Sequence, residues 1–228
     1  MTNAARRVAL VTDAGHYVGP ALALEFARRG HDLVIGDPAD GLVEELTELG
    51  ATVEVVDGVA NLARPESAPA LVEAALARFG KLDAAVAFSG QIIPGSFADS
   101  TIDQLRSLVT SCLEAPYNFL KAVTEPMVAA GSGQIVVITS AAGGRPTKGA
   151  SLYSSVRAGA TMLTRNVAGE VARTGVQVNA LGTNFMDFPE FHAAAGTDDP
   201  AIRAMFEKQV PMRRFGQLDE FASFAMAF

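Results

Sequence analysis

The amino-acid sequence predicts an α/β fold in which helices cover both faces of a doubly wound parallel sheet, organised as a single domain over residues 1–228. Short apolar runs alternate with amphipathic stretches along the chain, and a glycine-containing turn follows the first apolar run. The composition, 49% hydrophobic and 19% charged, shows no break between domains. Strands that alternate strictly with helices pair in parallel, and ligands of such sheets bind beyond the carboxyl ends of the strands.

Each element follows from a local pattern. Strands are predicted where short apolar runs rich in β-branched residues occur, at residues 7–11, 32–36, 52–56, 82–88, 134–139 and 176–180. Helices are predicted from amphipathic stretches, at residues 19–30, 42–49, 66–79, 102–130, 153–173 and 199–209, and from 218 onward. We expect the helix at 102–130 to bend at Pro116. The last helix is expected to run on at Phe228, which implies that the domain lacks its C-terminal strand.

The turn after the first strand, VTDAGHYVGP at residues 11–20, is short of glycine. A βα turn that holds a dinucleotide normally carries three glycines, which make room for the pyrophosphate and for the helix. In the spacing Thr-Gly-x-x-x-Gly-x-Gly only Gly19 is kept, because Asp13 and Tyr17 replace the other two glycines and Gly15 is out of register. A carboxylate would repel a diphosphate and a phenol ring would fill its volume. We therefore expect no cofactor at this turn.

Ser140, Tyr153 and Arg157 carry the predicted catalytic chemistry. Ser140 ends a predicted strand, and Tyr153 and Arg157 lie four residues apart on the next helix, hence on one face. A free tyrosine has a pKa of about 10, so a phenolate at neutral pH needs an adjacent cation, and arginine keeps its charge. We expect Arg157 to lower the pKa of Tyr153, which accepts the proton of a substrate hydroxyl while Ser140 holds the oxygen.

Charge and cysteine content exclude several classes of function. A net charge of −7 without a basic cluster argues against binding to nucleic acid. No run approaches the roughly 18 apolar residues of a membrane span, so we expect a cytoplasmic protein without membrane association. Cys112 is the single cysteine, and the histidines are scattered, so neither a disulfide nor a metal site is expected.

The two motifs together resemble a known superfamily. Ser140 and Tyr153 match the serine and the Tyr-x-x-x-Lys of the short-chain dehydrogenase/reductases, although Arg157 replaces the lysine. The spacing T-x-x-x-x-Y-x-G at residues 12–19, combined with these three residues, resembles the halohydrin dehalogenases, relatives in that superfamily that have lost the cofactor. The resemblance covers essentially the whole chain, including GQIVVITSA, RAGA and VPMRRFGQLDE. It implies a Rossmann-like domain.

The resemblance also implies which residues line the site. In the halohydrin dehalogenases a halide pocket takes the place of the nicotinamide, which implies halide or nucleophile contacts from Tyr17, Thr183, Asn184, Phe185 and Met186. Aromatic ring edges and backbone N–H groups hold an anion without a metal. Apolar residues that follow the strands are expected to form the substrate wall, namely Phe88, Ile92, Pro94, Phe188 and Phe191.

The activity implied by the resemblance is that of a cofactor-independent lyase. It converts vicinal haloalcohols into epoxides with release of halide and a proton, and it opens epoxides with small anions such as halide, azide, cyanide or nitrite. Halide leaves without a general acid, so a preorganised anion site is sufficient. The expected partners are a haloalcohol or epoxide and a small anion, and the expected assembly is a homotetramer.

Two alternatives from other classes stay open. A nicotinamide-dependent alcohol or ketone oxidoreductase is the leading one, and Asp37, placed where an acid would hold an adenosine ribose, favours it when taken alone. Against it, Cys112 stands where dehydrogenases often carry a helix asparagine, and residues 87–90 read AFSG where they have Asn-Asn-Ala-Gly. Asp37 is therefore interpreted as an inherited or solvated loop carboxylate. The second alternative is a non-catalytic relative that binds a small ligand.

Overall fold

The structure is a computed structural model that describes residues 6–228. A six-stranded sheet in the order β3-β2-β1-β4-β5-β6 forms its centre, and every neighbouring pair is parallel. This confirms the predicted doubly wound α/β architecture. Residues 1–5 of the predicted domain lie outside the described part of the chain. The strands are β1 (Arg7–Val11), β2 (His31–Gly36), β3 (Val53–Val56), β4 (Ala84–Phe88), β5 (Gly133–Ser140) and β6 (Val176–Thr183).

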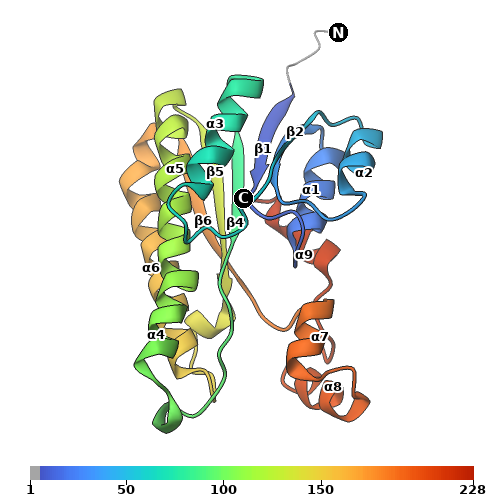
Figure 1. The fold of residues 1–228 in the computed structure, drawn as a ribbon, viewed down its shortest axis with the longest axis vertical. Coiled ribbons are helices and arrows are strands. Elements are labelled where there is room, and N and C mark those ends of the chain that lie inside the picture. The colour runs from blue at the N-terminus through green and yellow to red at the C-terminus, as the bar shows by residue number, and fades with distance from the viewer. Residues whose placement is uncertain (1–5) are drawn as a thin grey trace.

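Helices lie on both faces of the sheet, with α3, α5 and α6 on one side and α1, α2 and α9 on the other (Figure 1). Two further helices, α7 and α8, lie beyond the edge where the strands end. The sequence did not predict α7. The bounds are α1 (Gly19–Arg28), α2 (Leu42–Glu48), α3 (Ser67–Phe79), α4 (Ile102–Val109), α5 (Ala115–Ala130), α6 (Ser151–Val171), α7 (Pro189–Ala195), α8 (Pro200–Glu207) and α9 (Leu218–Ala225).

The alternation of side chains along β1 explains why both faces of the sheet need a helical layer. Val8 and Leu10 are buried in the cluster formed with α3 and α5, whereas Ala9 and Val11 are buried in the cluster formed with α1 and α9. Successive residues of a strand point to opposite faces, so a continuous apolar run is buried on both. The apolar runs that predicted the strands therefore also anchor the two helical layers.

The stretch predicted as one helix over residues 102–130 is helical throughout, but it contains a π-helical turn. α4 begins with a capping box between Thr101 and Gln104, a π-helical turn at Thr110–Glu114 follows it, and α5 then begins at Ala115. Pro116 directly follows this π turn and has no N–H, so it cannot donate the helical hydrogen bond to the preceding turn. The irregularity thus precedes Pro116, and a π turn of this kind often marks a functional site.

The last helix also differs from the prediction. α9 ends at Ala225, so the expectation that it is still running at Phe228 is wrong. Its apolar side packs against α1 and includes Ala222, which is buried.

Backbone contacts at the carboxyl edge of the sheet position the site. Ser140 at the end of β5 pairs in register with Thr183 at the end of β6, so these two residues lie side by side. At the start of α1, a Cβ on Gly19 would lie 1.9 Å from the carbonyl oxygen of Asp13. Only glycine allows α1 to approach the end of β1 so closely.

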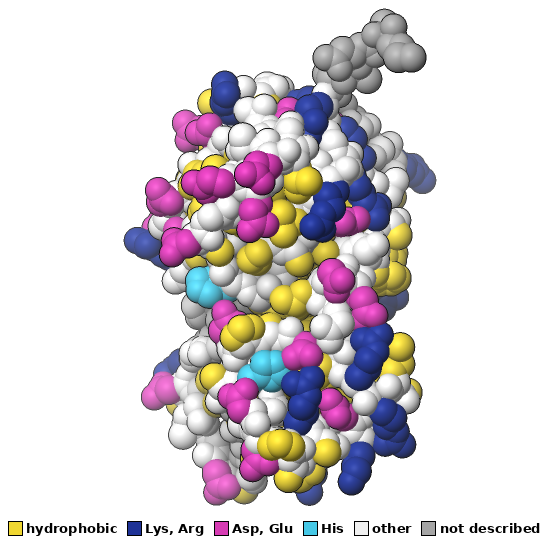
Figure 2. All heavy atoms as spheres, turned by 90° about the vertical axis from the view of Figure 1, so that its right-hand side faces the viewer, with side chains coloured by type: hydrophobic (Ala, Val, Ile, Leu, Met, Phe, Trp, Pro, Cys, Tyr) yellow, Lys and Arg dark blue, Asp and Glu magenta, His cyan; other side chains and the backbone are white. Residues whose placement is uncertain are grey.

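On the face of the molecule shown in Figure 2, Lys and Arg side chains are interspersed with Asp and Glu. Within residues 6–228 no helix is both long and apolar enough to span a bilayer.

Candidate active site

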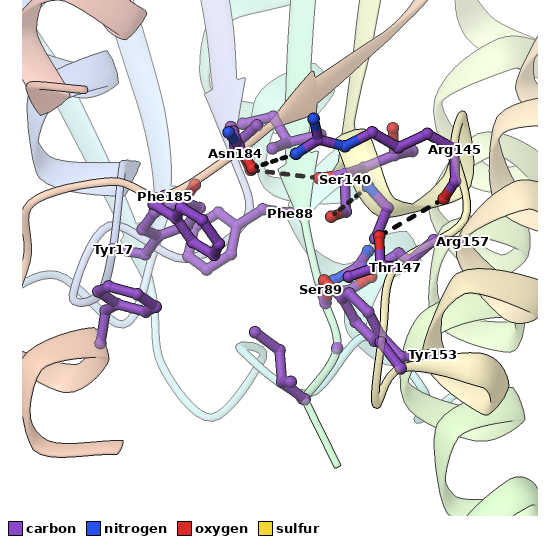
Figure 3. Close-up of a pocket in the computed structure, with 18 of the residues that line it drawn as sticks. Tyr17, Phe88, Ser89, Ser140, Arg145, Thr147, Tyr153, Arg157, Asn184 and Phe185 are labelled. Atoms are coloured by element: carbon purple, nitrogen blue, oxygen red, sulfur yellow. Dashed lines mark hydrogen bonds between the residues drawn. The ribbon is translucent and has the colours of Figure 1, made fainter. Parts of the chain in front are cut away.

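A cavity of about 510 Å³ opens at the carboxyl edge of the sheet, between the ends of β4, β5 and β6 and helix α7. Figure 3 shows its two sides: the aromatic side chains of Tyr17, Phe88 and Phe185 face the side that carries Tyr153 and Arg157. A pocket of this size at this edge is where the fold class places its ligands.

The structure brings the three predicted catalytic residues to this cavity. Ser140 lies at the end of β5, and its hydroxyl accepts a hydrogen bond of 3.2 Å from the backbone N–H of Ala142. Tyr153 and Arg157 are one turn apart on α6 and are both buried. The guanidinium carbon of Arg157 lies 5.2 Å from the centre of the Tyr153 ring, so the cation stacks on the ring. Arg157 and Tyr153 therefore lie close together, as expected, and their contact is a stacking of the guanidinium on the ring.

Arg157 is fixed from the side of β4. Its Nη2 donates a hydrogen bond to the backbone oxygen of Ser89, while Nε and Nη1 have no partner among the described residues. Gly90 has a φ of +102°, and a Cβ there would lie 2.5 Å from the Cys112 sulfur and 2.8 Å from Arg157 Nη2. The π turn thus presses Cys112 against Gly90, directly beside the guanidinium. Two buried nitrogen atoms of Arg157, Nε and Nη1, remain to be satisfied by a ligand or water.

Tyr17 forms the opposite, aromatic side of the cavity. Its ring packs at 5.5 Å from Phe88 and at 4.5 Å from Phe188, and its backbone adopts the left-handed conformation with φ of +51°. Burial raises the pKa of the Tyr17 phenol to about 12, while a hydrogen bond with the Thr183 side chain acts in the opposite direction. Tyr17 is therefore a neutral hydroxyl at physiological pH.

The turn that holds Tyr17 does not fit the diphosphate of a dinucleotide. The Asp13 carboxylate accepts a hydrogen bond of 2.9 Å from the N–H of Gly15 and contacts His16 Nδ1 at 3.2 Å. The N–H of Gly19 is bonded to the backbone oxygen of His16. A bound diphosphate needs free N–H donors and no negative charge at this position. Here the N–H groups of Gly15 and Gly19 are engaged, and a carboxylate is present.

Asp37 is likewise engaged within the protein. Its carboxylate accepts hydrogen bonds from the N–H groups of Gly58, Val59 and Ala60 at 2.6, 2.8 and 2.6 Å. From the sequence, Asp37 is interpreted as an inherited or solvated loop carboxylate, and the structure adds that it anchors the loop after β3. Its three hydrogen bonds give Asp37 a structural role within the protein.

The remaining predicted site residues divide into two groups. The cavity is lined by most of them, namely Phe88, Ile92, Thr183, Asn184, Phe185, Phe188 and Phe191. Pro94 and Met186 do not line it: Met186 is buried in contact with Gly216, and its sulfur would lie 2.7 Å from a Cβ at that position. The roles of these residues in binding stay predictions.

Sequence reasoning missed the polar residues contributed by the loop between β5 and α6. Arg145, Thr147 and Lys148 line the cavity, as does Gln209 after α8. The only signal for the loop residues was their place between two catalytic positions, in RPTKGASLY at residues 145–153.

A polar cluster holds α7 and α8 over the cavity. Asp187 accepts hydrogen bonds from Arg203 Nη2 at 2.9 Å and Gln217 Nε2 at 3.2 Å, and its other oxygen lies 2.6 Å from His192 Nε2. The hydrogen bond from Arg203 holds the pKa of Asp187 below its usual range. This cluster fixes Phe188 and Phe191 against the cavity.

Residues 6–228 contain no group of three or more His, Cys, Asp or Glu side chains placed to hold a metal ion.

Comparison with known proteins shows which enzymes the chain is similar to. The family model described as Enoyl-(Acyl carrier protein) reductase matches residues 15–228. A cis-4-hydroxycyclohexanecarboxylate dehydrogenase of Sinomonas cyclohexanicum is 34% identical over 98% of this chain and 89% of its own. A 3-oxoacyl-[acyl-carrier-protein] reductase FabG of Staphylococcus epidermidis is 27% identical over 94% of this chain and 88% of its own. The solved structure of NAD⁺-bound xylitol dehydrogenase superposes with a TM-score of 0.82 at 25% identity, covering 96% of this chain and 90% of that one.

These relatives correct the functional prediction. They are reductases and dehydrogenases, so the prediction of a cofactor-independent lyase that releases halide from haloalcohols is wrong. The nicotinamide-dependent oxidoreductase that the sequence left as an alternative agrees better with them. The misleading signals were Tyr17 and Arg157, which depart from the common pattern of the relatives' motifs without by themselves identifying another reaction.

Proposed function

We propose that this protein is an oxidoreductase. The premise is its family: this chain belongs to the short-chain dehydrogenase/reductase superfamily, in the family described as Enoyl-(Acyl carrier protein) reductase. The proposed substrate is an alcohol or ketone whose oxygen lies between Ser140 and Tyr153. The observation that carries the proposal is the convergence of Ser140, Tyr153 and Arg157 on one cavity, in a chain whose relatives are reductases and dehydrogenases.

The residues of this chain account for the proton transfer. The Tyr153 hydroxyl exchanges a proton with the substrate oxygen, and the Ser140 hydroxyl donates a hydrogen bond to the same oxygen. Arg157, buried and stacked at 5.2 Å on the Tyr153 ring, stabilises negative charge that develops during the transfer. The aromatic side chains of Phe88, Phe185 and Phe188 favour a substrate with an apolar body.

In this class of reaction a nicotinamide carries the hydride. The turn at Asp13 and Tyr17 does not fit the diphosphate of that group, because it holds a carboxylate and an aromatic ring there.

Turnover of a ketone tests the proposal. Acetophenone and its alcohol, phenylethanol, are supplied with NADH or NADPH and with NAD⁺ or NADP⁺, and the nicotinamide absorbance is followed. We expect turnover that falls by about a hundredfold to ten-thousandfold in Tyr153→Phe. Tyr117→Phe is the matched control, because Tyr117 is 53% exposed on α5. Absence of turnover with every cofactor, or full activity of Tyr153→Phe, would contradict the proposal.

A second candidate is a protein that binds a small ligand in the same cavity without redox chemistry. The engaged donors of the turn and the three hydrogen bonds of Asp37 favour it. Calorimetric titration with NADH and NADPH distinguishes the two candidates. If the wild type binds neither while Asp13→Gly/Tyr17→Gly gains affinity, and if acetophenone binds without turnover, the second candidate is supported. Micromolar binding of either dinucleotide to the wild type would contradict it.

A further inference from the structure

Resting on the proposed function, we propose that the substrate carries a carboxylate, which binds to Arg145 and Lys148 at the mouth of the cavity. These two residues then determine specificity: they select hydroxy or keto acids over neutral alcohols and ketones of the same shape.

The charge of the cavity lining differs from that of the whole molecule. The chain carries 25 acidic and 18 basic residues, a net charge of −7. The cavity nevertheless has three cationic residues in its lining, Arg145, Lys148 and Arg157, and none of its described lining residues is Asp or Glu. Such a lining produces a local positive potential within an acidic protein, which attracts an anionic ligand to the site.

The two cations at the mouth have no carboxylate partner among the described residues. Several other arginines of the surface are paired: Arg29 lies 2.8 Å from Glu25, and Arg214 lies 2.6 Å from Glu220. Arg145 instead donates one hydrogen bond of 3.0 Å, from Nη2 to the neutral amide oxygen of Asn184. The guanidinium has five N–H donors, so an edge remains for a carboxylate.

The bond to Asn184 also orients Arg145. Asn184 follows β6 on the far side of the opening, and Figure 3 shows the Arg145 side chain extending toward it above Ser140. On the other side of the loop, the backbone oxygen of Gly149 accepts a hydrogen bond of 2.9 Å from the N–H of Gly95, which holds the segment carrying Lys148. The two cations are therefore presented at the opening by a loop that is tied at both ends.

The layout of the cavity assigns separate places to the parts of such a substrate. Its oxygen lies deep, at Ser140 and Tyr153, its apolar body lies against Phe88 and Phe188, and its carboxylate lies at the solvent-exposed mouth. At that position the carboxylate keeps part of its hydration, which limits the desolvation penalty of forming the ion pair. A planar carboxylate also matches the planar fork of Arg145.

Binding of para-acetylbenzoate and of its uncharged methyl ester, each titrated calorimetrically into the protein without cofactor, tests the proposal. We expect the acid to bind about tenfold more tightly than the ester, and the preference to shrink when ionic strength rises from about 0.05 to about 0.5 M. Arg145→Gln/Lys148→Gln should remove the preference, because the affinity for the acid falls about tenfold more than the affinity for the ester. Lys121→Gln/Arg165→Gln is the matched control, because both residues are exposed, on α5 and α6, and neither lines the cavity.

Three outcomes would overturn the proposal: equal affinity for acid and ester, no binding of the acid at millimolar concentration, or an equal loss for acid and ester in the double variant. Reduction of neutral acetophenone is a separate measurement that does not involve the two cations. Its absence would contradict the proposed oxidoreductase function, whereas the calorimetric preference for the acid would still decide the role of Arg145 and Lys148.

Discussion

Replacing Asp37 by alanine is expected to destabilise the fold instead of removing a cofactor ligand. The carboxylate holds the N–H groups of Gly58, Val59 and Ala60 at 2.6, 2.8 and 2.6 Å, and the residue itself adopts a φ of +42°. Hydrogen bonds to a charged group contribute about 1.5–3 kcal/mol each when buried. Water replaces part of this at an exposed loop, so we count about 1 kcal/mol for each bond. The left-handed conformation, less favourable for alanine, adds a few tenths.

The expected loss in the free energy of unfolding of Asp37→Ala is therefore about 3 kcal/mol. With a urea dependence of about 3 kcal/mol per molar, the unfolding midpoint should fall by about 1 M, measured by far-UV circular dichroism because the chain has no tryptophan. Asp40→Ala is the control, since Asp40 is exposed on the same loop. Unchanged stability together with weaker NADH binding would refute the reasoning, because it would show the carboxylate to be a ribose ligand.

Three other predictions follow from packing and charge. In Gly19→Ala the new Cβ would lie 1.9 Å from a carbonyl oxygen, so this variant should lose about 2–4 kcal/mol of stability in urea unfolding. In Gly169→Ala the new Cβ has nothing within 4 Å, so this control should gain about 0.5–1 kcal/mol. Equal effects of the two substitutions would contradict the packing argument. Burial raises the pKa of Tyr17 to about 12, so this phenol contributes stability below about pH 10 that is lost as pH rises toward about 12. The phenol absorbance of wild type minus that of Tyr17→Phe, titrated against pH, should show a midpoint near 12. A midpoint near 10 would show that the Tyr17 phenol is not buried. Arg203 lowers the pKa of Asp187, so the stability that this carboxylate contributes is present at neutral pH and is lost as pH falls through its folded pKa. Asp187→Asn should lower the melting temperature at pH 7 and flatten its acid dependence, and parallel melting curves would contradict this.

The predicted elements agree best with the structure where the pattern of neighbouring residues alone determines which side chains are buried. β1 was predicted with its observed bounds, because an apolar run between polar residues is sufficient to identify a strand buried on both faces. α7 was missed, because Pro189–Ala195 is short and its place depends on aromatic contacts with residues distant in the chain, such as Phe215. The π turn before Pro116 has no sequence signature that distinguishes it from a regular helix.

The site was predictable in part for the same reason. Tyr153 and Arg157 share a helix, so their spacing alone placed them on one face. Arg145 and Asn184, which meet across the cavity mouth, are separated by 39 residues, and no local pattern joins them. The predicted reaction was wrong, because the replacements at Tyr17 and Arg157 do not by themselves specify a reaction, whereas the chain as a whole is similar to reductases and dehydrogenases.

By itself the sequence determined where the strands lie along the chain, the helical layers on both faces and the helix that carries Tyr153, because apolar periodicity is a property of neighbouring residues. Only the tertiary structure decided that Asp37 anchors a loop, that Arg157 stacks on the Tyr153 ring, and that Arg145 and Lys148 lie together at the mouth of the cavity. Those outcomes depend on which segments the parallel sheet brings to its carboxyl edge, and hydrogen bonds and charges between such segments are set by distances in space.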